Sequence, residues 1–289
     1  MPEIVFIIPA WDGDSLHRAL SLLTFQKDRS FRVHVVDLTG SGEAEAVAAE
    51  FEDRLPLRVV RADASAGPLW KYCLEAVPSA EWVCFLRPDV TFSDKSLPRM
   101  RQCIADHPAY DVFHWNLAEP FRQYGLKVSP DKLFTHVFVD GGVAPLSSFV
   151  FRAQTLRDAF DTDPEAAGMD LSAILAAAKK SGIRTARWER IGFSAPVPAT
   201  DPALVEKDVR ARLAFFRWSE RFFGEEYPLD VSDRLALFSK ELARLYPSFS
   251  PDALKEDLYS FAVVSGPIRK MRAASALKSA LKERQQTLQ

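Results

Sequence analysis

Between residues 4 and 87 the sequence alternates short apolar runs with segments that have the spacing of helices. The apolar runs are rich in β-branched and aromatic residues and lack a regular polar alternation, which is typical of strands covered on both faces of a parallel sheet. Strands and helices in alternation predict a right-handed, doubly wound α/β sheet. The predicted strands cover residues 4–8, 33–36, 57–60 and 82–86.

Helices are predicted between these strands. In the first one, Leu16, Leu20 and Leu23 recur at helical spacing, and Asp14 and Ser15 are both candidate caps for its start. The remaining elements of the first two thirds follow from the same periodicities. We expect helices at 43–53, 68–77, 95–104 and 166–181, the last closed by Gly182, strands at 111–115 and 148–152, and an irregular segment at 117–142.

Three prolines within residues 195–202 mark a boundary. We therefore expect an α/β domain over residues 1–196 and a helical C-terminal extension over residues 197–289. The helices of the extension are predicted near 203–223, 231–245, 251–264 and 268–286.

The composition excludes several classes of protein. A net charge of −2 over 289 residues gives no global reason to expect a nucleic-acid partner. No apolar run approaches the roughly 18 residues of a membrane-spanning helix, and the first residues lack the basic region of a signal peptide. Cys73, Cys84 and Cys103 form no CxxC pair, so we expect buried thiols in a reducing, cytoplasmic setting.

Ligands of an open parallel sheet bind at the carboxyl ends of its strands. Three of the predicted strands are followed there by an aspartate, namely Asp12, Asp37 and Asp89. A carboxylate at this edge can accept hydrogen bonds from a base or a ribose, or ligate a divalent cation.

Four motifs follow one another in order over residues 3–195. They are Ile7-Ile8-Pro9-Ala10-Trp11-Asp12-Gly13, then Val35-Val36-Asp37 with Gly40-Ser41, then Gly67 leading to Arg87-Pro88-Asp89, and then Phe149-Val150-Phe151-Arg152 leading to Met169-Asp170-Leu171. In this order they resemble family 2 glycosyltransferases. The resemblance implies a GT-A fold, a Rossmann-like mixed sheet that binds a nucleotide-sugar donor.

The resemblance also implies roles for single residues. Asp37 would bind the base of the donor, Asp89 would ligate a Mg²⁺ or Mn²⁺ on its diphosphate, and Asp170 would be the catalytic base of an inverting transfer to a hydroxyl. The acceptor would be a saccharide, a lipid-linked sugar or a protein, as in the synthesis of surface polysaccharides and glycoconjugates. Further donor contacts would come from Pro9, Trp11, Asp12, Gly67, Lys71 and Arg87.

This chain departs from the family pattern at the metal motif. Arg87 stands where the first acid of Asp-x-Asp is usual, and Met169 replaces the glutamate before the predicted base. A guanidinium has no acceptor atom and repels a cation. Either Arg87 and Lys71 act as fixed cations on the diphosphate, or Arg87 pairs with Asp89. The second alternative favours a non-catalytic GT-A-like binding or scaffolding protein.

Each of these residues also has a purely structural alternative. Asp37 could stabilise a turn, Asp170 could be an acid favoured at a helix N-terminus, and Trp11 could pack on the sheet edge. The sequence alone leaves these alternatives open.

The C-terminal third carries two further features. An aromatic stretch that includes Phe215, Phe216 and Trp218 is too apolar to lie wholly in water, and packing on the main domain or on a second copy of the chain would cover it. The predicted helix at 268–286 is basic, which suits peripheral contact with an anionic membrane surface; a solvated terminal helix is the alternative.

Overall fold

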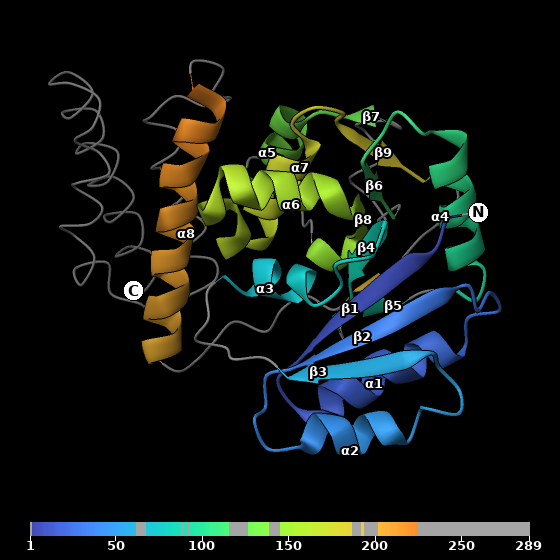
Figure 1. The fold of residues 1–289 in the computed structure, drawn as a ribbon. Helices are drawn as coiled ribbons and strands as arrows, with labels where there is room; N and C mark the ends of the chain where they lie inside the picture. The colour runs from blue at the N-terminus through green and yellow to red at the C-terminus, as the bar shows by residue number, and fades with distance from the viewer. Residues whose placement is uncertain are drawn as a thin grey trace, which may run out of the picture. The chain divides into compact units, whose positions relative to one another are not determined.

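The chain divides into two compact units, Met1–Ala195 and Pro196–Gln289. The larger unit is built on an eight-stranded sheet with the order β3-β2-β1-β4-β8-β6-β9-β7 (Figure 1). The computed structural model describes residues 2–61, 68–87, 90–91, 93–115, 127–138, 145–186, 192–193 and 202–224.

The strands confirm the α/β pattern read from the sequence. In chain order they are β1 (Ile4–Ala10), β2 (Phe31–Asp37), β3 (Leu57–Arg61), β4 (Trp82–Phe85), β5 (Val90–Thr91), β6 (Val112–His114), β7 (Lys127–Val128), β8 (Phe149–Arg152), β9 (Ile183–Thr185) and β10 (Gly192–Phe193). β5 and β10 form a separate antiparallel pair.

The sheet is mixed. β3, β2, β1 and β4 are parallel to one another, whereas β8 is antiparallel to both of its neighbours, β4 and β6. β9 is parallel to β6, and β7 closes the sheet antiparallel to β9. The parallel strands β1 to β4 and β6 therefore end at one common edge, called the carboxyl edge below. A mixed sheet is what the resemblance to the GT-A fold implies.

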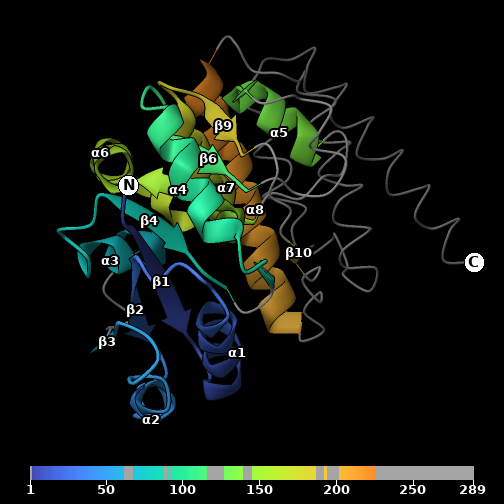
Figure 2. The ribbon, with the colours of Figure 1, turned by 90° about the vertical axis from the view of Figure 1, so that its right-hand side faces the viewer.

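Helices cover both faces of the parallel strands. α1 and α2 lie on one face of β1, β2 and β3, and α3 lies on the opposite face (Figures 1 and 2). The helices are α1 (Gly13–Thr24), α2 (Glu43–Ala49), α3 (Leu69–Glu75), α4 (Ser96–Asp106), α5 (Pro130–Phe138), α6 (Ala153–Thr162), α7 (Asp170–Ala178) and α8 (Pro202–Phe223), with 3-10 turns η2 (Leu146–Ser148) and η3 (Pro164–Gly168).

Burial on both faces explains why β1 has no polar alternation. All seven residues of β1 are buried, and its neighbours β2 and β4 flank it on either side. Each fully buried large apolar side chain stabilises the fold by about 1.5–3 kcal/mol relative to exposure. A continuous apolar strand is therefore stable only at the centre of a covered sheet.

Several elements differ from the sequence prediction. α6 was not predicted, because only Ala153, Leu156 and Phe160 of its ten residues are buried and its periodicity is short. β7 and α5 occupy part of the segment expected to be irregular. The helix predicted at 166–181 begins at Asp170, after a 3-10 turn, and ends at Ala178, earlier than expected. Gly182 has a φ of +69° and lies at the end of the turn that follows, where its N donates to Ala178 O at 2.8 Å.

The second unit contains α8, which confirms the helix predicted near 203–223. Phe215, Phe216 and Trp218 on α8 are buried, as expected of an aromatic stretch that water does not cover. The predicted helices at 231–245, 251–264 and 268–286 lie outside the described residues. Among the helices that the structure describes, none is both long and apolar enough to cross a membrane.

Candidate functional site at the carboxyl edge

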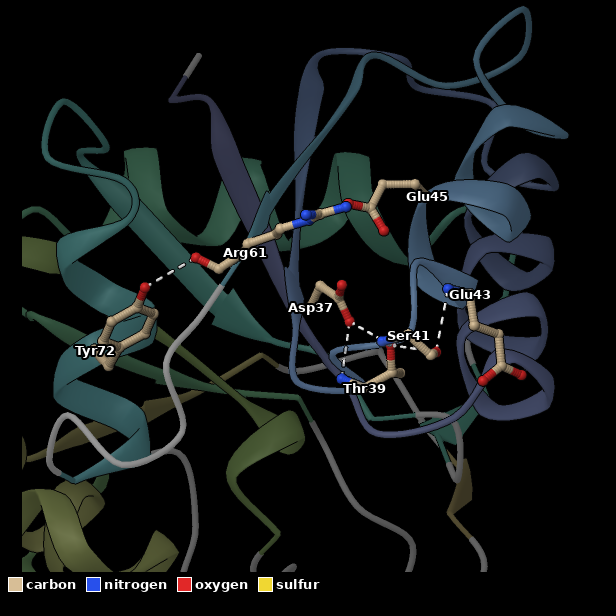
Figure 3. A network of polar contacts seen from close by, with 7 residues as sticks. All are labelled: Asp37, Thr39, Ser41, Glu43, Glu45, Arg61 and Tyr72. Carbon is tan, nitrogen blue, oxygen red and sulfur yellow. Dashed lines mark hydrogen bonds and ion pairs between the residues drawn. The ribbon is translucent and has the colours of Figure 1, made fainter.

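Asp37 ends β2 at the carboxyl edge. The sheet register places it opposite Ala10 of β1 and Arg61 of β3. The residue is 2% exposed, and its Oδ1 accepts hydrogen bonds from the backbone N and the Oγ1 of Thr39 at 2.8 and 2.7 Å (Figure 3). The turn that follows β2 thus holds the carboxylate in one orientation.

Asp37 is an ionised acceptor at neutral pH. Burial acts to raise the pKa of its carboxyl, but hydrogen bonds from Thr39 and the Gly40 amide, together with the charge of Arg61, lower it more. The net shift of the pKa is downward. An ionised carboxylate has only acceptor sites, which suits recognition of an N–H or O–H group on a ligand.

The turn after Asp37 is itself ordered by a chain of hydrogen bonds (Figure 3). Ser41 donates from its backbone N and its Oγ to Thr39 Oγ1 at 3.3 and 3.1 Å, and Glu43 N donates to Ser41 Oγ at 3.3 Å. Gly40 and Gly42 have φ values of +67° and +81°, a conformation that other residues rarely adopt. The backbone conformation of this turn therefore favours glycine at both positions.

Two further contacts form the rim of this site. Arg61 Nε donates to Glu45 Oε1 at 2.7 Å, and the Tyr72 hydroxyl donates to the Arg61 carbonyl at 3.0 Å (Figure 3). Gly13 N donates to Glu43 Oε1 at 3.0 Å, which ties the loop after β1 to the start of α2. These contacts link the start of α1 and the end of β3 to α2.

The first motif lies in β1 and the loop that follows it. Pro9 is buried within β1, whereas Trp11 is 50% exposed just beyond its end. Asp12 caps α1, because its Oδ1 accepts a hydrogen bond of 2.7 Å from Ser15 N. The prediction that Asp14 or Ser15 caps this helix is wrong: α1 begins at Gly13, so both residues lie inside its first turn.

The cap gives Asp12 a structural role at this edge. The backbone hydrogen bond from Ser15 lowers the pKa of Asp12. A carboxylate that caps a helix is also stabilised by the positive end of the helix dipole. Of the two side chains, the exposed ring of Trp11 is the more available to a ligand.

Arg87 and Asp170 meet at the same edge. Arg87 follows the end of β4, where Leu86 N donates to Ile7 O of β1 at 2.8 Å. Asp170 is the first residue of α7. The guanidinium Nη1 lies 3.8 Å from Asp170 Oδ2, and the two side chains are 37% and 31% exposed. The structure thus joins the third and fourth motifs through an ion pair.

Lys71 has a different partner. Its Nζ donates to Asp161 Oδ1 at 2.9 Å, which links α3 to α6. The hydrogen bond with Asp161 raises the pKa of Lys71. In this structure Lys71 is therefore paired with a carboxylate of the protein, and its contact with the donor diphosphate stays a prediction.

Gly67 and Asp89 lie outside the described residues, as does the predicted pairing of Arg87 with Asp89. The part of the chain that the structure describes contains no group of three His, Cys, Asp or Glu side chains placed to hold a metal ion. Arg87 stands beside Asp170 and adds a positive charge there. This charge does not fit a divalent cation.

Sequence reasoning missed Thr39, Glu43 and Asp161. Thr39 had a readable signal, since a hydroxyl residue two positions after a strand-ending aspartate is the pattern of an aspartate turn. Glu43 and Asp161 act through contacts with Gly13 and Lys71, which are distant in sequence. A local sequence pattern does not predict contacts between residues that are distant in the chain.

A separate cavity of about 450 Å³ lies at the opposite, amino end of the strands. Arg32 and His34 at the start of β2 and Arg58 at the start of β3 line it, together with the segment that precedes β4. None of the predicted site residues borders it. In doubly wound sheets ligands bind at the carboxyl edge instead, so the candidate site remains at that edge.

Comparison with known proteins gives structural relatives only. No protein-family model and no curated protein matches the chain. Residues 1–349 of S. aureus TarS in complex with UDP match with a TM-score of 0.62 at 15% identity, over 99% of this chain and 92% of that one. The same TarS segment with UDP-GlcNAc gives a TM-score of 0.55 at 16% identity, over 98% and 81%.

A second solved protein agrees with this result. Mannosyltransferase PcManGT from Pyrobaculum calidifontis, in complex with GDP-Man and Mn²⁺, matches with a TM-score of 0.59 at 18% identity, over 98% of this chain and 87% of that one. Identities this low establish the fold and leave the activity to be argued from the site. The chain has the GT-A fold of these glycosyltransferases, as the order of its four motifs predicts.

Proposed function

We propose that this protein transfers a sugar from a nucleotide-diphosphate donor to a hydroxyl acceptor, with inversion at the anomeric carbon. One observation carries the proposal. Asp37 ends β2 and Asp170 opens α7, and both stand at the carboxyl edge of the sheet, the second beside Arg87. UDP, UDP-GlcNAc and GDP-Man in the solved relatives support a nucleotide-sugar as the donor.

In the proposed reaction Asp37 accepts a hydrogen bond from the base of the donor. The acceptor oxygen attacks the anomeric carbon in line while the bond from that carbon to the diphosphate oxygen breaks. Asp170 takes the proton of the attacking hydroxyl, which is the role of a general base. The leaving diphosphate gathers negative charge and needs oriented cationic groups.

A bound divalent cation would supply part of the positive charge that the leaving diphosphate needs. The described residues do not fit such an ion, so no step of the proposed reaction runs through it. The acceptor we propose is a saccharide, a lipid-linked sugar or a protein hydroxyl, with the C-terminal extension as the segment that would bring the chain to a membrane surface or to a second copy.

A second candidate is a non-catalytic binding module. The observation that favours it is the Arg87–Asp170 ion pair, because a base engaged with a cation takes a proton less readily. In that case the protein would bind a nucleotide without turning over any donor.

Calorimetric titration of the full chain with UDP, GDP, UDP-GlcNAc and GDP-mannose tests the proposal, each with Mn²⁺ and with EDTA. We expect one base to bind in preference to the other, and the matching sugar donor to be consumed when acceptor saccharides are added. Binding without turnover would favour the binding module. A chain that binds no nucleotide under either condition would overturn both functions.

A further inference from the structure

Arg87 starts from a rigid part of the backbone. β4 is paired with β1 through Phe85 and Ile7, and the hydrogen bond from Leu86 N to Ile7 O extends this pairing by one residue. The side chain of Arg87, the residue after Leu86, is partly exposed. The backbone of Arg87 is therefore held by the sheet, while its guanidinium is accessible at the edge where the proposed donor binds.

The contact between Arg87 and Asp170 is an ion pair without a short hydrogen bond. The 3.8 Å between Nη1 and Oδ2 exceeds the 2.7–3.2 Å of an N–H···O bond. Partly exposed pairs of this kind stabilise a protein only slightly. A diphosphate, by contrast, offers oxygens that a guanidinium binds bidentately. A diphosphate at this edge therefore competes well with Asp170 for Arg87.

Lys71 is the less suitable cation. Its Nζ already donates a 2.9 Å hydrogen bond to Asp161, so a phosphate would have to displace a shorter contact. Arg87 is also the residue that occupies the first position of the metal motif. Its positive charge would oppose a divalent ion placed beside it.

We propose that Arg87 holds the diphosphate of the donor in place of a divalent metal, and that it leaves Asp170 when the donor binds. This inference rests on the proposed function. A carboxylate that loses a cationic neighbour accepts a proton more readily. Donor binding therefore makes Asp170 a better acceptor for the proton of the attacking hydroxyl. This order requires the donor to bind before the acceptor.

Titration of UDP and GDP, with uridine and guanosine as phosphate-free probes, tests this inference on the full chain. We expect the preferred diphosphate to bind equally well, within about twofold, in EDTA and in Mn²⁺. Arg87→Gln should weaken diphosphate binding by about tenfold or more, the loss of a charge-assisted hydrogen bond. It should leave nucleoside binding unchanged, and Arg87→Lys should restore part of the loss. Arg58→Gln, at the amino end of the strands, is the matched control.

A second titration tests whether Arg87 leaves Asp170 for the diphosphate. Asp170→Asn removes the group that competes for Arg87, so diphosphate should bind about two- to fivefold more tightly in EDTA. A residue that only shaped the site would weaken binding when altered. Unchanged or weaker binding would overturn the exchange.

The outcomes separate this inference from the proposed function. Nucleotide binding that requires Mn²⁺, or that Arg87→Gln leaves intact, overturns the role of Arg87 while a nucleotide-sugar site remains. Absence of nucleotide binding under every condition overturns both.

Discussion

The guanidinium of Arg87 stands 3.8 Å from the carboxylate of Asp170, across the carboxyl edge of the sheet. One residue follows a parallel strand and the other opens a helix that lies far along the chain. Their proximity gathers the third and fourth sequence motifs into one site. Asp170 is therefore the first carboxylate to test by substitution.

Asp170→Asn should abolish sugar transfer while nucleotide binding is retained, because an amide cannot take the proton of the acceptor. A loss of turnover of about 10²-fold or more is expected for a general base. The control is Asp131→Asn, an exposed acid in the first turn of another helix, α5. Transfer at the original rate in the Asp170 variant would remove it as the base.

Asp37→Asn should weaken nucleotide binding by about tenfold or more, since a hydrogen bond to a charged acceptor is lost. Calorimetry with UDP and GDP measures the effect. Asp53→Asn changes an exposed carboxylate in the turn after α2 and should leave affinity unaltered. Equal affinity of the Asp37 variant and the original chain would assign Asp37 to the turn alone.

Trp11→Ala should lower nucleotide affinity by about two- to tenfold if the half-exposed ring stacks on the base or the sugar. The fold should tolerate the change, because the ring is not part of the core. Phe25→Ala removes the other large exposed apolar side chain of the described residues, at the far end of α1, and serves as the control. Identical affinities for both variants would leave Trp11 without a role in binding.

Asp28→Ala should destabilise the fold by about 3 kcal/mol, because it leaves the largely buried guanidinium of Arg101 without this carboxylate. Their side chains are 16% and 9% exposed, and Arg101 also donates to the Pro2 carbonyl at 2.6 Å. The free energy of unfolding in urea measures the loss. Lys27→Ala breaks the exposed pair with Asp94 and should cost less than about 1 kcal/mol. Equal effects would contradict this ranking.

Acidification should destabilise the protein through His114. Burial first, and then the charge of His136, lowers the pKa of His114 to about 3, whereas an unfolded histidine titrates near 6.5. Between these values the unfolded chain binds the proton and the native chain does not. Stability therefore falls as the pH drops below about 6.5, by up to about 1.4 kcal/mol per pH unit.

His114→Gln should remove this part of the pH dependence. Between pH 7 and pH 5 the free energy of unfolding of the original chain should fall about 2 kcal/mol more than that of the variant. Parallel pH profiles for the chain and the His114 variant would show that the buried imidazole is not responsible.

The strands near the N-terminus could be predicted closely because they lie at the centre of a sheet covered on both faces. Residues 4–8 and 82–86 were read as strands, and the structure has Ile4–Ala10 and Trp82–Phe85. α6 could not be predicted in the same way. It buries only three side chains, too few to give its short segment a clear period.

The residues of the candidate site also differ in how far local sequence predicts them. Asp37 could be proposed from the sequence because a strand and its following turn are local, and the end of a parallel strand lies where ligands bind. The cap of α1 was misassigned by two or three positions, since Asp12, Asp14 and Ser15 are all residue types that can cap a helix. Only the backbone conformation selects among them.

The α/β class, the GT-A order of motifs and the replacement of an acid by Arg87 in the metal motif can all be read without the structure. These features are local, because strand periodicity and residue identity need no distant partner. Tertiary structure alone decided that Arg87 faces Asp170 and that Lys71 faces Asp161. Both pairs join segments far apart in the chain, and the charge on a residue does not specify which opposite charge the fold will bring to it.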